Sequence, residues 1–259
     1  MIKEKVFLLD MDGTIYLGND LIDGAAKFIE TIRSHDKKVI FLTNNSSKSR
    51  IEYVNKLCKL GISAKIEDIF SSTEATLYYL KGLNKGNKVY LVGTPSFEES
   101  FKNAGFLLVS DNDNPDFVVL GYDTTLTYDK VRTACSYIQK GVAYIATHPD
   151  VICPIENHQY IPDIGSIIEM IKAVTKQEPL IIGKPYKHII DAVTAEYKVS
   201  KEDLIITGDR IYTDIKTGVN AGISSVLVLS GETTKDDLEK SDVKPTYVFN
   251  SVKDMIPLI

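Results

Sequence analysis

The chain has 259 residues, a formal net charge of −5, and 44% apolar and 25% charged residues, which is the composition of an ordinary globular protein. The acidic balance and the lack of a basic cluster with interleaved aromatics argue against a nucleic-acid surface. No apolar run approaches the roughly 20 residues of a membrane span. We therefore expect one large or two modest domains, with neither nucleic acid nor membrane as a partner.

The first strand signal is an apolar run at residues 6–9 that ends in Asp10 and Asp12, followed by Gly13 and Thr14. A short apolar run bounded by polar residues is typical of a buried parallel strand. Open α/β sheets place their chemistry at the carboxyl ends of such strands. Because two acids there are costly unless a cation or a reaction needs them, this end of the strand is a candidate site.

Three further strand signals also end in reactive polar residues. The runs at 38–42, 180–183 and 204–207 are followed by polar groups in a fixed order. These groups are Thr43 with Asn44 and Asn45, then Lys184, then Asp209 and Asp214. Each group precedes a helix-like pattern, so the four strand ends are expected to meet at one edge of a sheet.

These residues resemble the four motifs of the haloacid-dehalogenase superfamily, namely Asp10-x-Asp12-Gly13-Thr14, Thr43-Asn44, Lys184 and Gly208-Asp209-x-x-x-x-Asp214. The longer phrases at 10–16, 42–46 and 208–214 are similar to its NagD-type, or p-nitrophenylphosphatase-type, branch. The resemblance covers nearly the whole chain, with no departure at the motif positions. It implies an α/β fold with a Rossmann-like parallel-sheet core and an inserted α/β cap domain.

About 100 residues separate the second motif from the third, and they carry their own alternation of strand and helix signals. Apolar runs at 89–92, 117–120 and 143–146 predict strands, and isoleucines over 164–171 predict a helix. A structureless loop of that length would be implausible. We expect a core from residues 1–78 and 180–259, with a cap at 79–179, as the resemblance also implies.

The acids fit the hydrolysis of a phosphate ester. A carboxylate nucleophile and a phosphate dianion repel each other, and Mg²⁺ prefers a few carboxylates together with water and phosphate oxygen. Asp10 and Asp209 are the expected side-chain ligands, and the resemblance adds the main-chain oxygen of Asp12. Asp214 is expected either to support the metal site or to be an ordinary acid near a helix N-terminus.

Asp10 is the expected nucleophile, forming an aspartyl-phosphate that divides one hard step into two. Asp12 is the expected general acid and base, and in an extended strand its side chain would share the side of Asp10. ATPase pumps and dehalogenases of the superfamily lack an acid at this position. The resemblance therefore implies rapid turnover to free phosphate.

Thr43, Asn44 and Asn45 can donate hydrogen bonds to phosphoryl oxygens, although such residues also commonly cap helices. Lys184 supplies a point positive charge for the nucleophile and the phosphoryl group.

In the inserted segment, His148, Asp163 and Ser166 lie in polar stretches beside strand and helix signals. They are expected to cap a helix or, as the resemblance implies for the cap, to contact the leaving group.

These patterns predict a Mg²⁺-dependent phosphatase acting on a small cytosolic phosphorylated metabolite, such as a sugar phosphate or a nucleoside monophosphate. A cytoplasmic location is expected because Cys58, Cys135 and Cys153 are widely spaced and odd in number, and because no signal peptide pattern opens the chain.

Three other functions share some of these features. A receiver-type signalling domain would be about half this length and would hold its acid pair before the phosphorylated aspartate. A nucleotide-binding module is disfavoured because no P-loop or dinucleotide glycine fingerprint follows a strand signal. A phosphotransferase or mutase stays open, as do the leaving group and the oligomeric state.

Overall fold

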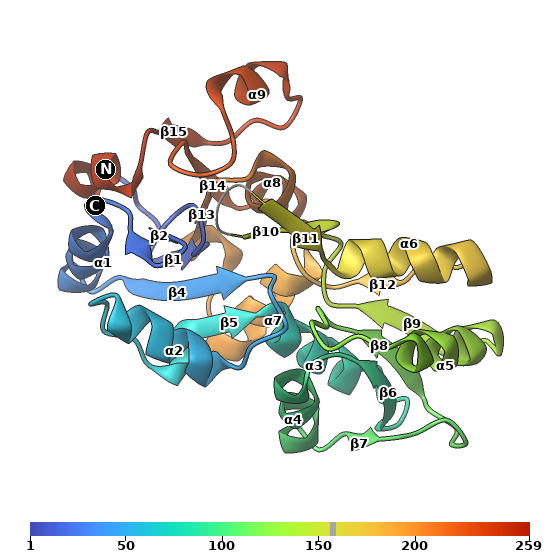
Figure 1. Cartoon of the computed structure of the whole chain (residues 1–259). Helices are drawn as coiled ribbons and strands as arrows, with labels where there is room; N and C mark the ends of the chain where they lie inside the picture. Colours follow the sequence, from blue (N-terminus) through green and yellow to red (C-terminus); the bar gives the residue numbers. More distant parts are fainter. Residues whose placement is uncertain (156–158) are drawn as a thin grey trace. The chain divides into compact units, whose positions relative to one another are not determined.

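The computed structural model describes residues 1–155 and 159–259, and the chain divides into two compact units (Figure 1). The first unit consists of Met1–Thr43, Arg50–Phe70 and Lys184–Ile259, and the second consists of Asn44–Ser49 and Ser71–Gly183. Each unit has its own sheet and its own hydrophobic core. Within the described residues, no helix combines the length and apolar character needed to cross a membrane.

The sheet of the first unit has six strands in the order β15-β14-β13-β1-β4-β5. Their bounds are β1 (Val6–Leu9), β4 (Lys38–Thr43), β5 (Ile69–Ser71), β13 (Leu204–Gly208), β14 (Ser224–Val228) and β15 (Tyr247–Phe249). Strand β1 lies between β13 and β4 and pairs with both in parallel. All four of its residues are buried, which explains the unbroken apolar run at this point in the sequence.

The helices of the first unit are α1 (Ala25–Ser34), α2 (Arg50–Lys59), α7 (His188–Tyr197), α8 (Lys216–Ala221) and α9 (Lys235–Lys240). Shorter elements are the β2–β3 hairpin (Tyr16–Leu17, Asp20–Leu21), a π-helical turn (Ile211–Ile215) and 3₁₀ turns at Ile66–Asp68, Lys201–Asp203 and Val252–Leu258. Helix α1 packs Phe28, Ile29 and Ile32 into a core with Phe7 and Phe41 of the sheet. This packing holds β1 and β4 in register.

The second unit has a five-stranded sheet in the order β12-β9-β8-β6-β7 and a separate β10–β11 hairpin. Its strands are β6 (Lys88–Val92), β7 (Leu107–Leu108), β8 (Phe117–Leu120), β9 (Ala143–Ala146), β10 (Ile152–Ile155), β11 (Gln159–Pro162) and β12 (Leu180–Ile181). Its helices are α3 (Ser72–Leu83), α4 (Pro95–Asn103), α5 (Tyr128–Gln139) and α6 (Ile164–Thr175). The isoleucines of α6 and the buried face of α5 share one core with this sheet.

The predicted α/β architecture is confirmed, because both larger sheets are built from parallel pairs connected through helices. The division falls after residues 70 and 183, whereas the sequence predicted boundaries at 79 and 179. Strand β12 pairs in parallel with β9, so the apolar run expected to return to the core belongs to the second sheet. An apolar run shows that a strand exists but does not show which sheet it joins.

Replacing Phe28 by alanine should destabilise the first unit by about 3–5 kcal/mol, because a fully buried aromatic side chain leaves a cavity. Its ring meets that of Phe7 edge-on, with the centroids 6.2 Å apart. Urea unfolding measures the change. Lys27→Ala, on the exposed side of the same helix, should shift stability by less than about 0.5 kcal/mol. Equal effects of the two substitutions would contradict this packing.

Candidate active site

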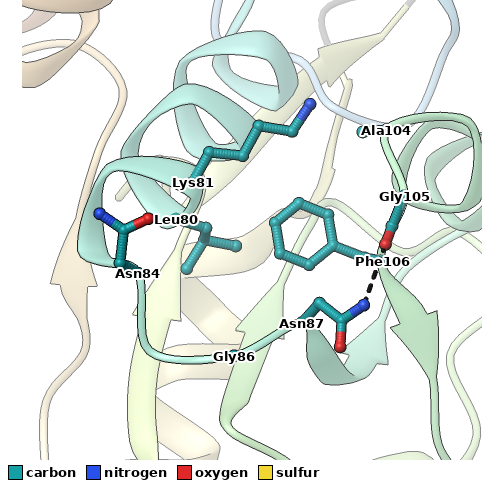
Figure 2. A pocket seen from close by; sticks show the side chains of 8 residues that line it. All are labelled: Leu80, Lys81, Asn84, Gly86, Asn87, Ala104, Gly105 and Phe106. Atoms are coloured by element: carbon teal, nitrogen blue, oxygen red, sulfur yellow. Dashed lines mark hydrogen bonds between the residues drawn. The ribbon is translucent and has the colours of Figure 1, made fainter.

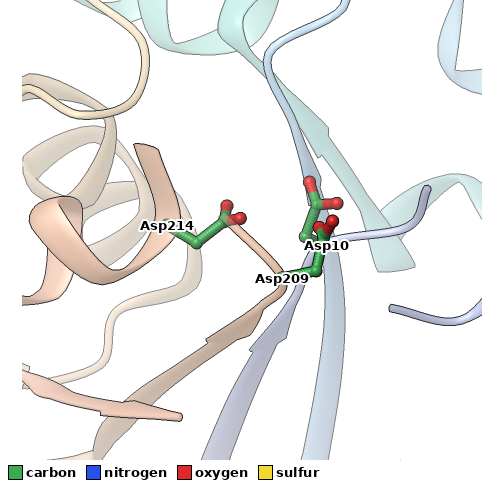
Figure 3. A group of neighbouring side chains, drawn as sticks. All are labelled: Asp10, Asp209 and Asp214. Carbon is green, nitrogen blue, oxygen red and sulfur yellow. The ribbon is translucent and has the colours of Figure 1, made fainter. Parts of the chain in front are cut away.

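Three carboxylates meet at the carboxyl edge of the first sheet. Asp10 follows β1, Asp209 follows β13, and Asp214 lies in the π-helical turn after it (Figure 3). One oxygen from each of them lies within 4.8 Å of the others. The parallel register pairs Leu9 with Thr207, so the chain leaves both strands at the same level. We call these three residues the acidic cluster.

Lys184 joins two members of the acidic cluster. Its Nζ donates to Oδ1 of Asp10 and to Oδ1 of Asp214, each at 2.6 Å, and the side chain is only 3% exposed. Burial alone would lower the pKa of this ammonium, but the two carboxylates outweigh burial and raise the pKa above its ordinary value. Lys184 is therefore charged, and it holds both acids at fixed distances.

The carboxylate of Asp209 is enclosed by backbone. A Cβ on Gly13 or on Gly231 would overlap its Oδ2, so neither position has room for a side chain. The same Oδ2 accepts a hydrogen bond from the backbone N–H of Glu232 at 2.7 Å. Its Oδ1 is buried and has no hydrogen-bond partner among the described residues. One oxygen of Asp209 is thus committed to the protein, and the other is available for a ligand.

The acidic cluster carries more negative charge than its surroundings offset. Burial raises the pKa of Asp10 to about 6, although Lys184 opposes the shift. Burial together with the charges of Asp10 and Asp214 raises the pKa of Asp209 to about 8. A hard divalent cation with oxygen ligands would relieve this repulsion and would fill the open coordination of Oδ1 of Asp209. The donor set therefore fits Mg²⁺.

Asp12 lies beyond the end of β1, where the chain turns into the β2–β3 hairpin. It is exposed and forms an isolated bridge with Tyr16, while Gly13 N donates to Tyr16 O at 2.8 Å. Strand β1 ends at Leu9, so Asp12 lies outside the regular strand, and the expectation that its side chain shares the side of Asp10 stays a prediction. Burial raises the pKa of the Tyr16 hydroxyl, and the charges of Asp12 and Asp10 add to the shift.

The Thr43-Asn44 motif is divided between the two units. Thr43 ends β4, whose register pairs Phe41 with Leu9, so Thr43 lies at the same sheet edge as Asp10. Asn44 belongs to the second unit, where its Nδ2 donates to Oδ2 of Asp150 at 3.1 Å.

Asn45, the third residue predicted to contact phosphate, braces a local turn. Its Oδ1 accepts from the backbone N and the hydroxyl of Ser47, at 2.9 and 2.7 Å. Neighbouring Ser46 belongs to the second unit, where its hydroxyl lies 3.0 Å from that of Thr147 and accepts from Tyr122 N.

In the second unit, His148, Asp163 and Ser166 surround the start of α6. The His148 ring is 1% exposed and lies between Asp150 (Nδ1 to Oδ2, 3.3 Å) and Asp163 (Nε2 to Oδ1, 3.8 Å). Asp163 caps α6 by accepting from Ile164 N at 2.6 Å, and Ser166 Oγ donates to a backbone oxygen. These contacts confirm the capping role of Asp163, and substrate contact by these residues stays a prediction.

A surface pocket of about 360 Å³ lies in the second unit, away from every predicted site residue (Figure 2). Its lining residues are Leu80, Lys81, Asn84, Gly86, Asn87, Ala104, Gly105 and Phe106. One lysine supplies its only charge, and Asn87 Nδ2 is already bonded to Gly105 O at 3.3 Å. The pocket therefore lacks the convergent polar groups of a binding site.

The structure adds site residues that the sequence patterns did not single out. Arg210 places Nε 2.9 Å from Oε2 of Glu232, and Ser230 Oγ donates to Gly13 O at 2.8 Å. Residues 230–233 follow β14, a further strand whose carboxyl end lies at the same edge. The polar run after the apolar residues 226–229 was the available signal, since ligands bind beyond the carboxyl ends of such strands.

Comparison with known proteins agrees with this arrangement. Residues 7–107 match the family model described as haloacid dehalogenase-like hydrolase, and residues 181–255 match a second model, described as HAD-hydrolase-like. An acid sugar phosphatase from Staphylococcus haemolyticus is 38% identical over 248 residues, which cover 96% of this chain and 94% of that protein.

Solved structures show the same likeness. The 4-nitrophenylphosphatase of Thermotoga maritima superposes with a TM-score of 0.94 at 41% identity, covering 98% of this chain and 97% of that one. The glycerol phosphate phosphatase of Mycobacterium tuberculosis, solved with magnesium, superposes with a TM-score of 0.91 at 28% identity, covering 98% of this chain and 76% of that one.

Fold and site together define a haloacid dehalogenase-like hydrolase. The chain belongs to the NagD-type, or 4-nitrophenylphosphatase-type, branch of that family, and it is a phosphatase.

In metal-free buffer, Asp209→Asn should raise thermal stability at pH 8 more than at pH 5. The pKa of Asp209 in the folded state lies above its ordinary value of 3.8. Its contribution to the free energy of unfolding is therefore complete below about pH 4 and is lost as the pH rises towards 8. One pKa unit is worth about 1.4 kcal/mol, and about 1 kcal/mol shifts the Tm of a chain this long by roughly 2–4 °C. We therefore expect a difference of several degrees.

Melting curves in EDTA at the two pH values measure this difference. Asp20→Asn, at an exposed acid of the same unit, should give the same Tm change at both pH values. A gain in Tm for Asp209→Asn that does not depend on pH would show that ionisation of Asp209 does not destabilise the folded protein.

Proposed function

We propose that this phosphatase hydrolyses small phosphomonoesters with Mg²⁺ through an aspartyl-phosphate on Asp10. The observation that carries the proposal is the pairing of Lys184 with Asp10 beside an Asp209 oxygen that has no hydrogen-bond partner among the described residues. This arrangement offers a nucleophile, a fixed positive charge and an open cation ligand at one strand edge. Each of these is needed for attack on a phosphate dianion.

Asp10 and Asp209 would hold the ion through their carboxylates, together with the main-chain oxygen of Asp12, and Asp214 would support the site. When bound, Mg²⁺ supplies positive charge that offsets the repulsion between a carboxylate and a phosphate dianion. The acidic cluster supports this proposal, as does the magnesium with which the mycobacterial neighbour was solved.

Asp10 attacks phosphorus through a carboxylate oxygen, and the bond from phosphorus to the ester oxygen breaks. Lys184 keeps this carboxylate ionised and oriented, since its Nζ lies 2.6 Å from Oδ1. The ammonium also contacts Asp214, so it cannot swing away from the cluster. Lys184 thus acts as a fixed counter-charge for the nucleophile and for the phosphoryl oxygens.

Asp12 donates a proton to the departing alkoxide and then removes one from the water that cleaves the aspartyl-phosphate. Its exposed position at the tight turn after β1 leaves its carboxyl group accessible to both species. Thr43, Asn44 and Asn45 donate hydrogen bonds to phosphoryl oxygens.

The substrate class is a small phosphorylated metabolite, and a sugar phosphate is favoured because the staphylococcal relative is named an acid sugar phosphatase. Specificity would reside in the second unit, which carries none of the acids of the cluster. His148, Asp163 and Ser166 are the residues proposed to face the leaving group there. A cytoplasmic location is supported by three cysteines that form no disulfide.

Asp10→Asn tests the proposal directly. The amide is nearly isosteric but is a poor nucleophile and a weaker metal ligand, so p-nitrophenyl phosphate turnover should fall by about 10³-fold or more. Circular dichroism and Tm should confirm an intact fold. EDTA should abolish wild-type activity, and added Mg²⁺ should restore it. Near-normal phosphate release by a folded Asp10→Asn protein would remove Asp10 from this role.

Asp12→Ala should slow esters with poor leaving groups more than p-nitrophenyl phosphate, because an activated leaving group needs less protonation. A positioned general acid contributes about 10²–10⁴-fold, and most of this range should appear for an alkyl phosphate. Phosphate release across a series of esters with rising leaving-group pKa measures the effect. Equal losses across the series, with no phosphoenzyme trapped by acid quench, would count against Asp12 as acid and base.

A further inference from the structure

The loop after β14, residues 230–233, surrounds Asp209. Glu232 N–H donates to Asp209 Oδ2 at 2.7 Å, and Thr233 N–H donates to the main-chain oxygen of Asp209 at 3.2 Å. A side chain at Gly231 would overlap the same carboxylate. The loop therefore fixes which Asp209 oxygen faces the protein, and so which one faces a ligand.

The side chain of Glu232 anchors this loop to the segment that follows Asp209. Its Oε2 lies 2.9 Å from Nε of Arg210, and its Oε1 accepts from the hydroxyl of Tyr212 at 2.5 Å. Ile211 N–H completes the link by donating to Thr233 Oγ1 at 3.3 Å. Glu232 thus forms an ion pair with Arg210 and accepts a hydrogen bond from Tyr212, and together with the Ile211–Thr233 contact these link the loop to three consecutive residues.

We propose that Glu232 is a positioning residue for a divalent cation at Asp209. Its side chain, held by Arg210 and Tyr212, keeps its own N–H against Oδ2 of Asp209 and thereby leaves Oδ1 to bind the cation. The inference rests on the proposed function, in which Asp209 is a Mg²⁺ ligand. Groups that orient a metal ligand typically change metal affinity by 10- to 100-fold when they are lost.

A second effect of Glu232 has to be separated from this one. Its negative charge attracts a cation through space, whatever the loop does. Tyr212→Phe removes one of the two contacts that hold the Glu232 side chain and changes no charge. Tyr247→Phe, at an exposed tyrosine of β15, removes a hydroxyl from the same unit without touching the loop. These two variants form a matched pair.

Isothermal titration calorimetry of the substrate-free, full-length protein with Mg²⁺ alone is the experiment. Glu232→Ala should raise the Mg²⁺ Kd by about 10- to 100-fold. Tyr212→Phe should raise it by roughly threefold, since one of two contacts to a half-exposed carboxylate remains. Glu232→Gln keeps one acceptor oxygen, so its Mg²⁺ Kd should lie between those of Tyr212→Phe and Glu232→Ala. The Kd of Tyr247→Phe should match that of the wild type.

At saturating Mg²⁺ the kcat for p-nitrophenyl phosphate should return to within about twofold of the wild-type value in each variant, because the reacting groups are untouched. A general structural defect would lower kcat and Tm together and would not be rescued by the cation. The inference is overturned if the Mg²⁺ Kd is unchanged in both Tyr212→Phe and Glu232→Ala. It is also overturned if Tyr212→Phe leaves the Kd unchanged while the two Glu232 variants raise it equally. A wild-type protein that binds no Mg²⁺ would overturn it as well.

The proposed function fails in a different way. A wild-type protein that binds Mg²⁺ but releases no phosphate from any ester would refute the phosphomonoester mechanism and leave the Kd series intact. Normal hydrolysis with an unchanged Kd series would refute only the role of Glu232. The two readouts therefore distinguish the two claims.

Discussion

The acidic cluster depends on one buried ammonium group. Lys184 Nζ contacts Asp10 and Asp214 at 2.6 Å each, in a place where three carboxylates would otherwise repel one another. Removing one partner from a buried ion pair is typically far more damaging than replacing both, because the remaining charge is left uncompensated. Two of the three acids are therefore held directly by Lys184, and the nearby Arg210 adds a second positive charge that lowers the pKa of Asp10 and of Asp209 against the effect of burial.

The acidic cluster still carries an excess of negative charge, and the proposed function depends on this excess. The pKa of Asp209 is raised because burial and its neighbours disfavour its ionised form. An apolar replacement would relieve that cost and also remove any reason for a cation to bind. In the proposed function, this strand edge gives up stability in exchange for binding a cation and a phosphate, a trade-off that is common at active sites.

Most of the fold was predictable from the sequence because its signals are local. The apolar runs at 117–120 and 143–146 coincide with β8 and β9, and the isoleucines over 164–171 lie in α6 as expected. The pairing of strands was less predictable. The apolar run of β12 contains nothing that indicates which sheet the strand joins, and it pairs with β9. The end of β1 before Asp12 was not predictable for a related reason, because where a strand ends depends on the turn that follows it.

The motif acids and Lys184 stand out in the sequence because they are reactive groups that follow apolar runs, whereas the backbone that surrounds them in space does not stand out. Gly13 and Gly231 carry no reactive side chain, yet a methyl group at either position would overlap the Asp209 carboxylate. A natural variant could keep every acid and the lysine and still lose the site through one alanine. Judged by its reactive residues alone, such a chain would be classified as an active enzyme. The steric overlap at Asp209 would instead identify it as a pseudoenzyme.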